Sequence, residues 1–122
     1  MIKHHIDVSS ALRQSVSQTY SHLVTRSTGA AVRAFIERAI EQGAMDVAVI
    51  DFTHVGMMDF SCADEIVAKL VLNHNGDGQH RFMFSGLNEA HVEAIDAVLE
   101  RHGMALVAKD DDVSMYVATA VH

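Results

Sequence analysis

Proline and tryptophan are absent from the sequence, and cysteine occurs once, at Cys62. Without proline, no proline-rich linker or rigid turn marks a domain boundary, and the length fits one domain with one core. A lone cysteine cannot form an internal disulfide, which is typical of proteins from a reducing compartment. The sequence therefore predicts a single domain over residues 1–122 that holds no disulfide bond.

Basic residues are scarce, and no apolar run approaches the length that is needed to cross a bilayer. Sixteen Asp and Glu outnumber nine Lys and Arg, which gives a net charge of −7. Such a charge repels both a nucleic-acid backbone and an anionic membrane surface, so neither is an expected partner. The first residues, 1–7, do not resemble a secretory signal, and we therefore expect a cytoplasmic protein.

Apolar residues form strand-like runs and helical stripes in alternation. Strands are predicted at 2–6, 47–52, 81–84 and 105–108, and helices at 28–43, 62–72, 88–103 and 110–120, with Thr28 and Asn88 as N-caps and Gly43 and Gly103 as ends. This alternation predicts an α/β domain with a small, mixed, largely parallel sheet of about four strands backed by helices. For residues 8–24 two alternatives stay open: a helix from Val8, or an extended segment over 16–24.

A polar cluster, Asp59-Phe60-Ser61-Cys62, separates the strand at 47–52 from the next helix. Ser61 followed by Asp64 is close to a capping box, which predicts that Ser61 starts the helix. The turn also follows the carboxyl end of a strand, where parallel sheets bind partners. It is therefore either a helix start alone or a recognition turn. Phe60 is either a core plug, which burial statistics favour, or an exposed anchor for a partner.

Cys62 occupies the first helical turn, where the helix dipole lowers the pKa of a thiol. The same residue lies on the apolar stripe of that helix, which favours inert packing. A redox sensor or enzyme that uses Cys62, with His54 as base, is the alternative function. The nine histidines lack metal-ligand spacing, and no catalytic or phosphate-binding motif is present. We therefore expect no metal, no cofactor and no catalytic residue.

The central block resembles a STAS domain, the module named for sulfate transporters and anti-sigma-factor antagonists. These domains carry an apolar strand with a DL/DF-x-x-V pattern, then an aspartate, small hydroxyl residues and a helix. The corresponding residues here are Asp51, Phe52, Val55, Asp59, Ser61 and the helix through Leu70. "FSCADEI" is also similar to the "SFADE" signature of a smaller STAS-like group of uncertain role. The resemblance covers residues 25–122, and residues 1–24 form a divergent N-terminal segment.

The resemblance implies a non-enzymatic regulatory module that binds another signalling protein, such as an ATPase-type anti-sigma kinase. It places the binding surface on the turn and the outer face of the next helix, at Asp59, Phe60, Ser61, Asp64, Glu65 and Lys69. In phosphorylated members a serine or threonine follows the aspartate directly. Phe60 occupies that position here, so the usual phosphorylation switch is lost or has moved to Ser61. A structural homodimer is the remaining alternative.

Overall fold

The structure, a computed structural model, describes residues 3–17, 21–42, 47–74, 81–108 and 115–119. Its elements in chain order are β1 (Lys3–Asp7), α1 (Val8–Ser15), α2 (Arg26–Gln42), β2 (Val47–Asp51), α3 (Phe60–Ala63), η1 (Asp64–Lys69), α4 (Leu70–His74), β3 (Arg81–Ser85), α5 (Glu89–Arg101), β4 (Met104–Ala108) and β5 (Met115–Thr119). The π-helical segment η1 joins α3 to α4 without a break. These three segments together are called the central helix below. The chain is a mixed α/β domain, as its alternating pattern predicts.

The described strands form one sheet in the order β1-β2-β3-β5-β4. β1, β2 and β3 run parallel, in a register that places Ile6, Ile50 and Phe84 side by side. β5 pairs antiparallel with both β3 and β4. The sheet is therefore parallel at the β1 side and antiparallel at the β4 side. The predicted count of about four strands is not confirmed, because β5 adds a fifth.

β5 occupies a segment for which the sequence predicts a helix that begins near Asp110. Apolar residues at helical spacing carry that prediction, but a run as short as Met115–Thr119 fits either period. Tyr116, Val117 and Thr119 are types that fit a pleated sheet surface well, and pairing with β3 and β4 decides the outcome. The predicted helix is therefore wrong for 115–119, and its predicted caps, residues 110–112, lie outside the described residues.

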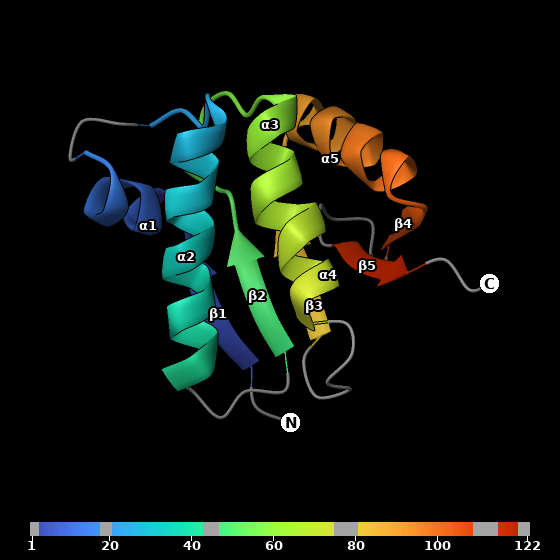
Figure 1. Cartoon of the computed structure of the whole chain (residues 1–122), viewed down its shortest axis with the longest axis horizontal. Coiled ribbons are helices and arrows are strands. Elements are labelled where there is room, and N and C mark those ends of the chain that lie inside the picture. The colour runs from blue at the N-terminus through green and yellow to red at the C-terminus, as the bar shows by residue number, and fades with distance from the viewer. Residues whose placement is uncertain (1–2, 18–20, 43–46, 75–80, 109–114, 120–122) are drawn as a thin grey trace.

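The helices cover one face of the sheet, and the core lies between the two layers. α2 and the central helix run side by side in front of β1, β2 and β3 (Figure 1). Ile6, Ile50 and Phe84 are buried on the covered face of the strands, and Ile36 and Ile66 are buried on the helices above them. The described residues include no helix that is long and apolar enough to cross a membrane.

The predicted helix starts are confirmed for α5 and wrong for α2. The side chain of Asn88 accepts a hydrogen bond from the His91 N–H, and His91 Nδ1 accepts one from the Asn88 N–H, which completes a capping box. α2 begins two residues before Thr28, after Thr25 has turned the chain with a φ of 73°. Thr28 is therefore a buried residue inside the helix rather than its cap.

The sequence also predicts the ends of two helices and the conformation of the N-terminal segment. Gly103 has a φ of 68° and follows α5, which agrees with its predicted role as the end of that helix. Gly43, the predicted end of α2, lies outside the described residues. α1 confirms the helical alternative over Val8–Ser15 only, and within 16–24 Leu23 forms an isolated parallel bridge with Met58.

Candidate functional site

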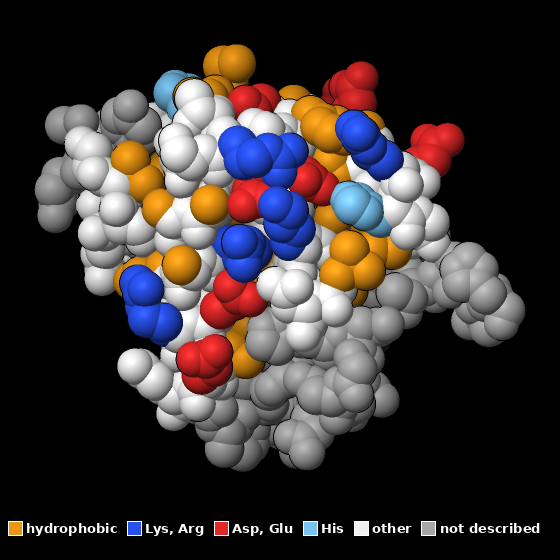
Figure 2. Space-filling model, viewed as in Figure 1, with side chains coloured by type: hydrophobic (Ala, Val, Ile, Leu, Met, Phe, Trp, Pro, Cys, Tyr) orange, Lys and Arg blue, Asp and Glu red, His pale blue; other side chains and the backbone are white. Residues whose placement is uncertain are grey.

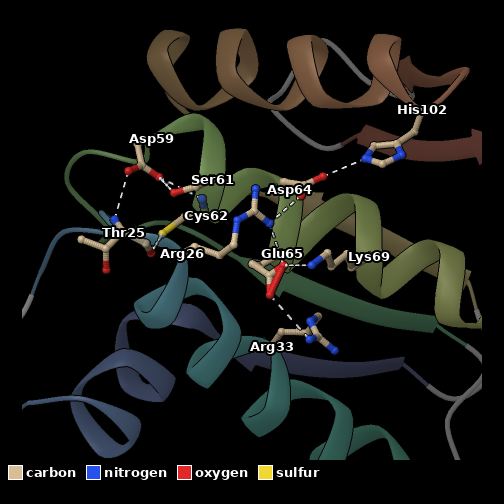
Figure 3. Close-up of polar contacts among 10 residues, drawn as sticks. All are labelled: Thr25, Arg26, Arg33, Asp59, Ser61, Cys62, Asp64, Glu65, Lys69 and His102. Carbon is tan, nitrogen blue, oxygen red and sulfur yellow. Dashed lines mark hydrogen bonds and ion pairs between the residues drawn. The ribbon is translucent and has the colours of Figure 1, made fainter.

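The central helix begins at a cap that is made by Asp59. Its Oδ1 accepts hydrogen bonds from the Cys62 N–H and the Ser61 hydroxyl, each at 2.8 Å, and its Oδ2 accepts one from the Thr25 N–H at 3.0 Å (Figure 3). The prediction that Ser61 caps the helix is wrong, because Asp59, the extended residue before the helix, accepts the Cys62 N–H of the first turn. Ser61 is instead a donor to that cap.

The charge of Asp59 is stabilised inside the turn. Burial by itself would raise the pKa of this carboxyl. The Cys62 N–H, the Thr25 N–H and the Ser61 hydroxyl outweigh that effect, and the pKa of Asp59 lies below its usual value. Both oxygens of the carboxylate are committed to these internal bonds. Asp59 therefore maintains the shape of the turn.

The segment that precedes α2 holds the same turn along its backbone. The Leu23 N–H donates to the Met57 carbonyl at 2.8 Å, and the Asp59 N–H donates to the Leu23 carbonyl at 2.9 Å. The Gly56 N–H donates to the Ser21 carbonyl at 2.7 Å. Residues 52–59, which we call the β2–α3 turn, are thus fixed by a short strand-like pairing.

Two apolar side chains at the end of this turn face solvent. Met57 is 64% exposed, and Phe60, the first residue of α3, is 38% exposed. The guanidinium of Arg101, from the last turn of α5, lies 5.7 Å from the centroid of the Phe60 ring, which is a cation–π distance. The favoured prediction of a core plug is therefore wrong for Phe60. Sequence reasoning missed Met57 and Arg101, because an apolar residue beside a turn resembles core and α5 is distant in sequence.

Asp64 and Glu65 are buried, at 8% and 3% exposure, although the sequence placed them on an outer helix face. The Arg26 guanidinium bridges the two carboxylates, at 2.7 Å from Asp64 Oδ2 and 3.0 Å from Glu65 Oε2 (Figure 3). That prediction is wrong because α2 packs along the π-helical segment and covers both residues. Their charges therefore serve helix packing.

Further basic side chains surround this acidic pair. Lys69 and Arg33 form ion pairs with Glu65, and His102 Nε2 lies 2.7 Å from Asp64 Oδ1. Figure 2 shows Lys and Arg side chains gathered at the centre of this face, with acidic side chains between them. Burial would raise the pKa values of both acids, but hydrogen bonds and charges from the neighbouring basic side chains reverse that effect and hold both pKa values below their usual range. The network joins α2, the central helix and the end of α5.

Cys62 lies behind the cap and is fully buried. Its thiol donates a hydrogen bond to the Thr25 carbonyl at 3.0 Å. Burial, reinforced by the charge of Asp59, raises the pKa of Cys62 to about 12. The thiol is therefore protonated at neutral pH, whereas redox and nucleophilic chemistry require a thiolate. His54, the suggested base, is exposed on the β2–α3 turn.

Three of the six predicted partner-binding residues, Asp59, Phe60 and Ser61, lie together at the helix start, and Lys69 is half-exposed above Glu65. Within the described ranges no group of three or more His, Cys, Asp or Glu side chains is arranged to hold a metal ion. Comparison with known protein families, curated proteins and solved structures found no match for this chain.

Proposed function

We propose that this chain is a non-enzymatic, cytoplasmic regulatory module of STAS-like fold, which binds a signalling protein through the end of the β2–α3 turn and the start of the central helix. The exposed pair of Met57 and Phe60 carries this proposal. Aromatic, methionine and arginine side chains are enriched in protein interfaces, and Arg101 stands beside Phe60. The turn beneath them is already ordered, so binding costs little conformational entropy.

The burial of the acidic pair changes which residues meet the partner. Met57, Phe60 and Arg101 form the centre of the proposed surface, which we call the docking patch. Asp59 supports that patch through the helix cap, and Lys69 lies further along the central helix. The resemblance to anti-sigma-factor antagonists supports an ATPase-type kinase, or another regulatory protein, as the partner.

The position of Ser61 supports binding that is not controlled by the usual phosphorylation switch. Its hydroxyl donates to Asp59 and is half-buried. A phosphate on this oxygen would remove that donor and place negative charge against the Asp59 carboxylate. We therefore propose that phosphorylation of Ser61 would weaken the helix cap, and that Phe60 serves as a permanent contact in place of a phosphate acceptor.

Site-specific photo-crosslinking in the native host tests the docking patch. A benzophenone amino acid is placed at Met57 in one variant and at Leu72 in the control, since Leu72 is 41% exposed at the other end of the central helix. We expect the Met57 probe to capture a discrete partner that the Leu72 probe does not. Identical products from both positions would count against the proposed surface.

Binding of the purified partner then measures the contribution of each side chain. We expect Phe60→Ser and Met57→Lys each to weaken binding by about tenfold or more, because both changes remove an apolar contact from the centre of the interface. Leu72→Ser, at a similarly exposed position, should leave the affinity within about twofold of the original. Unchanged affinity in Phe60→Ser, with an unchanged unfolding midpoint, would refute the docking patch.

A further inference from the structure

Two histidines from distant parts of the chain hold successive residues of the β2–α3 turn. The Met57 N–H donates to Nδ1 of His22 at 2.9 Å. The Gly56 carbonyl lies 2.7 Å from Nε2 of His91, which belongs to α5. The backbone that presents Met57 is thus fastened by one imidazole from the segment before α2 and by another from the helix on the other side.

The hydrogen bonds define the charge state that both rings need. His91 Nδ1 accepts the Asn88 N–H at 3.2 Å, so this nitrogen carries no proton and Nε2 is the donor to Gly56. His22 Nδ1 also accepts an N–H, from Met57, and carries no proton either. Both arrangements exist only for the neutral imidazole, because a protonated ring has donors at both nitrogens.

The packing around the rings makes these contacts specific. A Cβ atom at position 56 would lie 2.4 Å from His22 Nδ1, so Gly56 provides the space that the His22 ring occupies. His91 is fully buried, and its ring centroid lies 5.8 Å from that of Phe52. A charge on His91 would therefore lack water to solvate it.

Titratable groups on the surrounding elements do not offset such a charge through a direct contact. Asp59, on the same turn, is committed to the helix cap, and His54 is exposed. Glu89 and Glu93 are exposed on α5, and Arg26, at the start of α2, is engaged by the buried acidic pair. Among the described residues, no hydrogen bond or ion pair links any of these groups to either ring.

We propose that His22 is a pH-sensitive anchor of the β2–α3 turn, which His91 holds from the other side through its Nε2–H. When acid protonates Nδ1 of His22, that proton opposes the Met57 N–H and breaks the hydrogen bond there. A proton on Nδ1 of His91 would break only the bond to the Asn88 N–H, because Nε2–H still donates to the Gly56 carbonyl. The turn is then released, and the docking patch loses its fixed geometry. Only this last step rests on the proposed function, because release of the turn is a property of the chain alone.

Nuclear magnetic resonance on the isolated chain tests this fastening without any partner. We expect the imidazole nitrogen shifts at about pH 7.5 to show an unprotonated Nδ1 in both His22 and His91. We expect the protection factor of the Met57 amide against hydrogen exchange to fall about tenfold between about pH 7.5 and pH 5.5, as one hydrogen bond is lost. A proton on Nδ1 of either ring at the higher pH would overturn the proposal.

Two matched variants separate the fastening from a general effect of acid. His22→Asn keeps an acceptor near the position of Nδ1 but does not titrate, so Met57 protection should change less than about twofold over the same pH range. His54→Asn, on the same turn, should show the same fall as the unmodified chain. An equal fall in His22→Asn, or no fall in the unmodified chain, would refute the proposal. Neither result depends on whether Phe60→Ser binds a partner.

Discussion

The carboxylate of Asp59 links two segments that are 34 residues apart in sequence. Its Oδ2 holds the Thr25 N–H, while Oδ1 caps the central helix. Thr25 has a φ of 73°, a conformation that a β-branched residue rarely adopts, and the bond to Asp59 helps to maintain it. One side chain thus fixes the start of α2 and the start of the central helix together.

Replacement of Asp59 tests this double role. We expect Asp59→Ala to lower the free energy of unfolding by about 2 kcal/mol or more, since it removes a helix cap and a second bonded amide. Asp59→Asn keeps a carbonyl acceptor for the cap and should cost less. Urea denaturation measures both variants. A loss below about 0.5 kcal/mol in Asp59→Ala would show that the cap is dispensable.

Local sequence patterns predicted the roles of some site residues correctly and the roles of others wrongly. The sequence indicated that a cap lies between Asp59 and Asp64, but Ser61 and Asp59 are both good capping residues and only the backbone conformation chooses between them. The inert packing favoured for Cys62 agrees with its burial, because its position on the apolar stripe was visible. The partnership of Phe60 with Arg101 depends on how α5 packs, which no local pattern contains.

At the level of elements, α2 and the central helix approach each other closely at Gly29. A Cβ atom at this position would lie 2.9 Å from the Cys62 Cα and 3.1 Å from the Glu65 Cβ. The same close approach lets Arg26 reach both buried carboxylates. Gly29 and the ion pairs of Arg26 are therefore parts of one contact between the two helices. In the sequence, Gly29 is only a glycine inside a predicted helix, and nothing local indicates this contact.

Larger side chains at position 29 should separate the two helices. We expect Gly29→Ala to destabilise the protein by about 1–2 kcal/mol, because overpacking outweighs the gain in helix propensity, and Gly29→Val to cost more. Ala30→Ser, at a half-buried neighbouring position, should change stability by less than about 0.5 kcal/mol. Thermal unfolding compares the three variants. A more stable Gly29→Ala protein would contradict the close contact.

Element types were predictable wherever a segment was long enough to show one clear period. The stripes of α2 and α5 and the buried run of β2 correspond to the predicted elements. β5 was misassigned because five residues carry little periodic information and its partners β3 and β4 come from elsewhere in the chain. The burial of Asp64 and Glu65 was missed for a related reason, since Arg26, Arg33 and His102 come from other elements.

For the whole molecule, the carboxyl groups make stability depend on pH. The pKa values of Asp59, Asp64 and Glu65 lie below their usual range, against the opposing effect of burial. Groups of this kind bind protons more tightly in the unfolded chain, so their contribution is present above the unfolded pKa of about 4. That contribution is lost as the pH falls through the lower pKa values of the folded state.

We therefore expect the contribution of these carboxylates to the free energy of unfolding to fall steadily below about pH 4. Between about pH 5 and pH 7 this contribution should change little. Urea titrations at several pH values measure this curve. Glu65→Gln should give a less stable protein with a shallower loss in acid, whereas Glu93→Gln, an exposed change on α5, should keep the original slope. Identical slopes in all three proteins would show that the buried acidic pair does not control acid unfolding.

The strand order has a consequence for the biosynthesis of the protein. β5 follows β4 in the chain but lies between β3 and β4 in the sheet. As the polypeptide leaves the ribosome, β4 emerges before the strand that connects it to the sheet, and the β3 edge stays open in the nascent chain. Open strand edges pair readily with other chains. The β3 edge is covered only after residues 115–119 have been translated, so this short strand completes the sheet last.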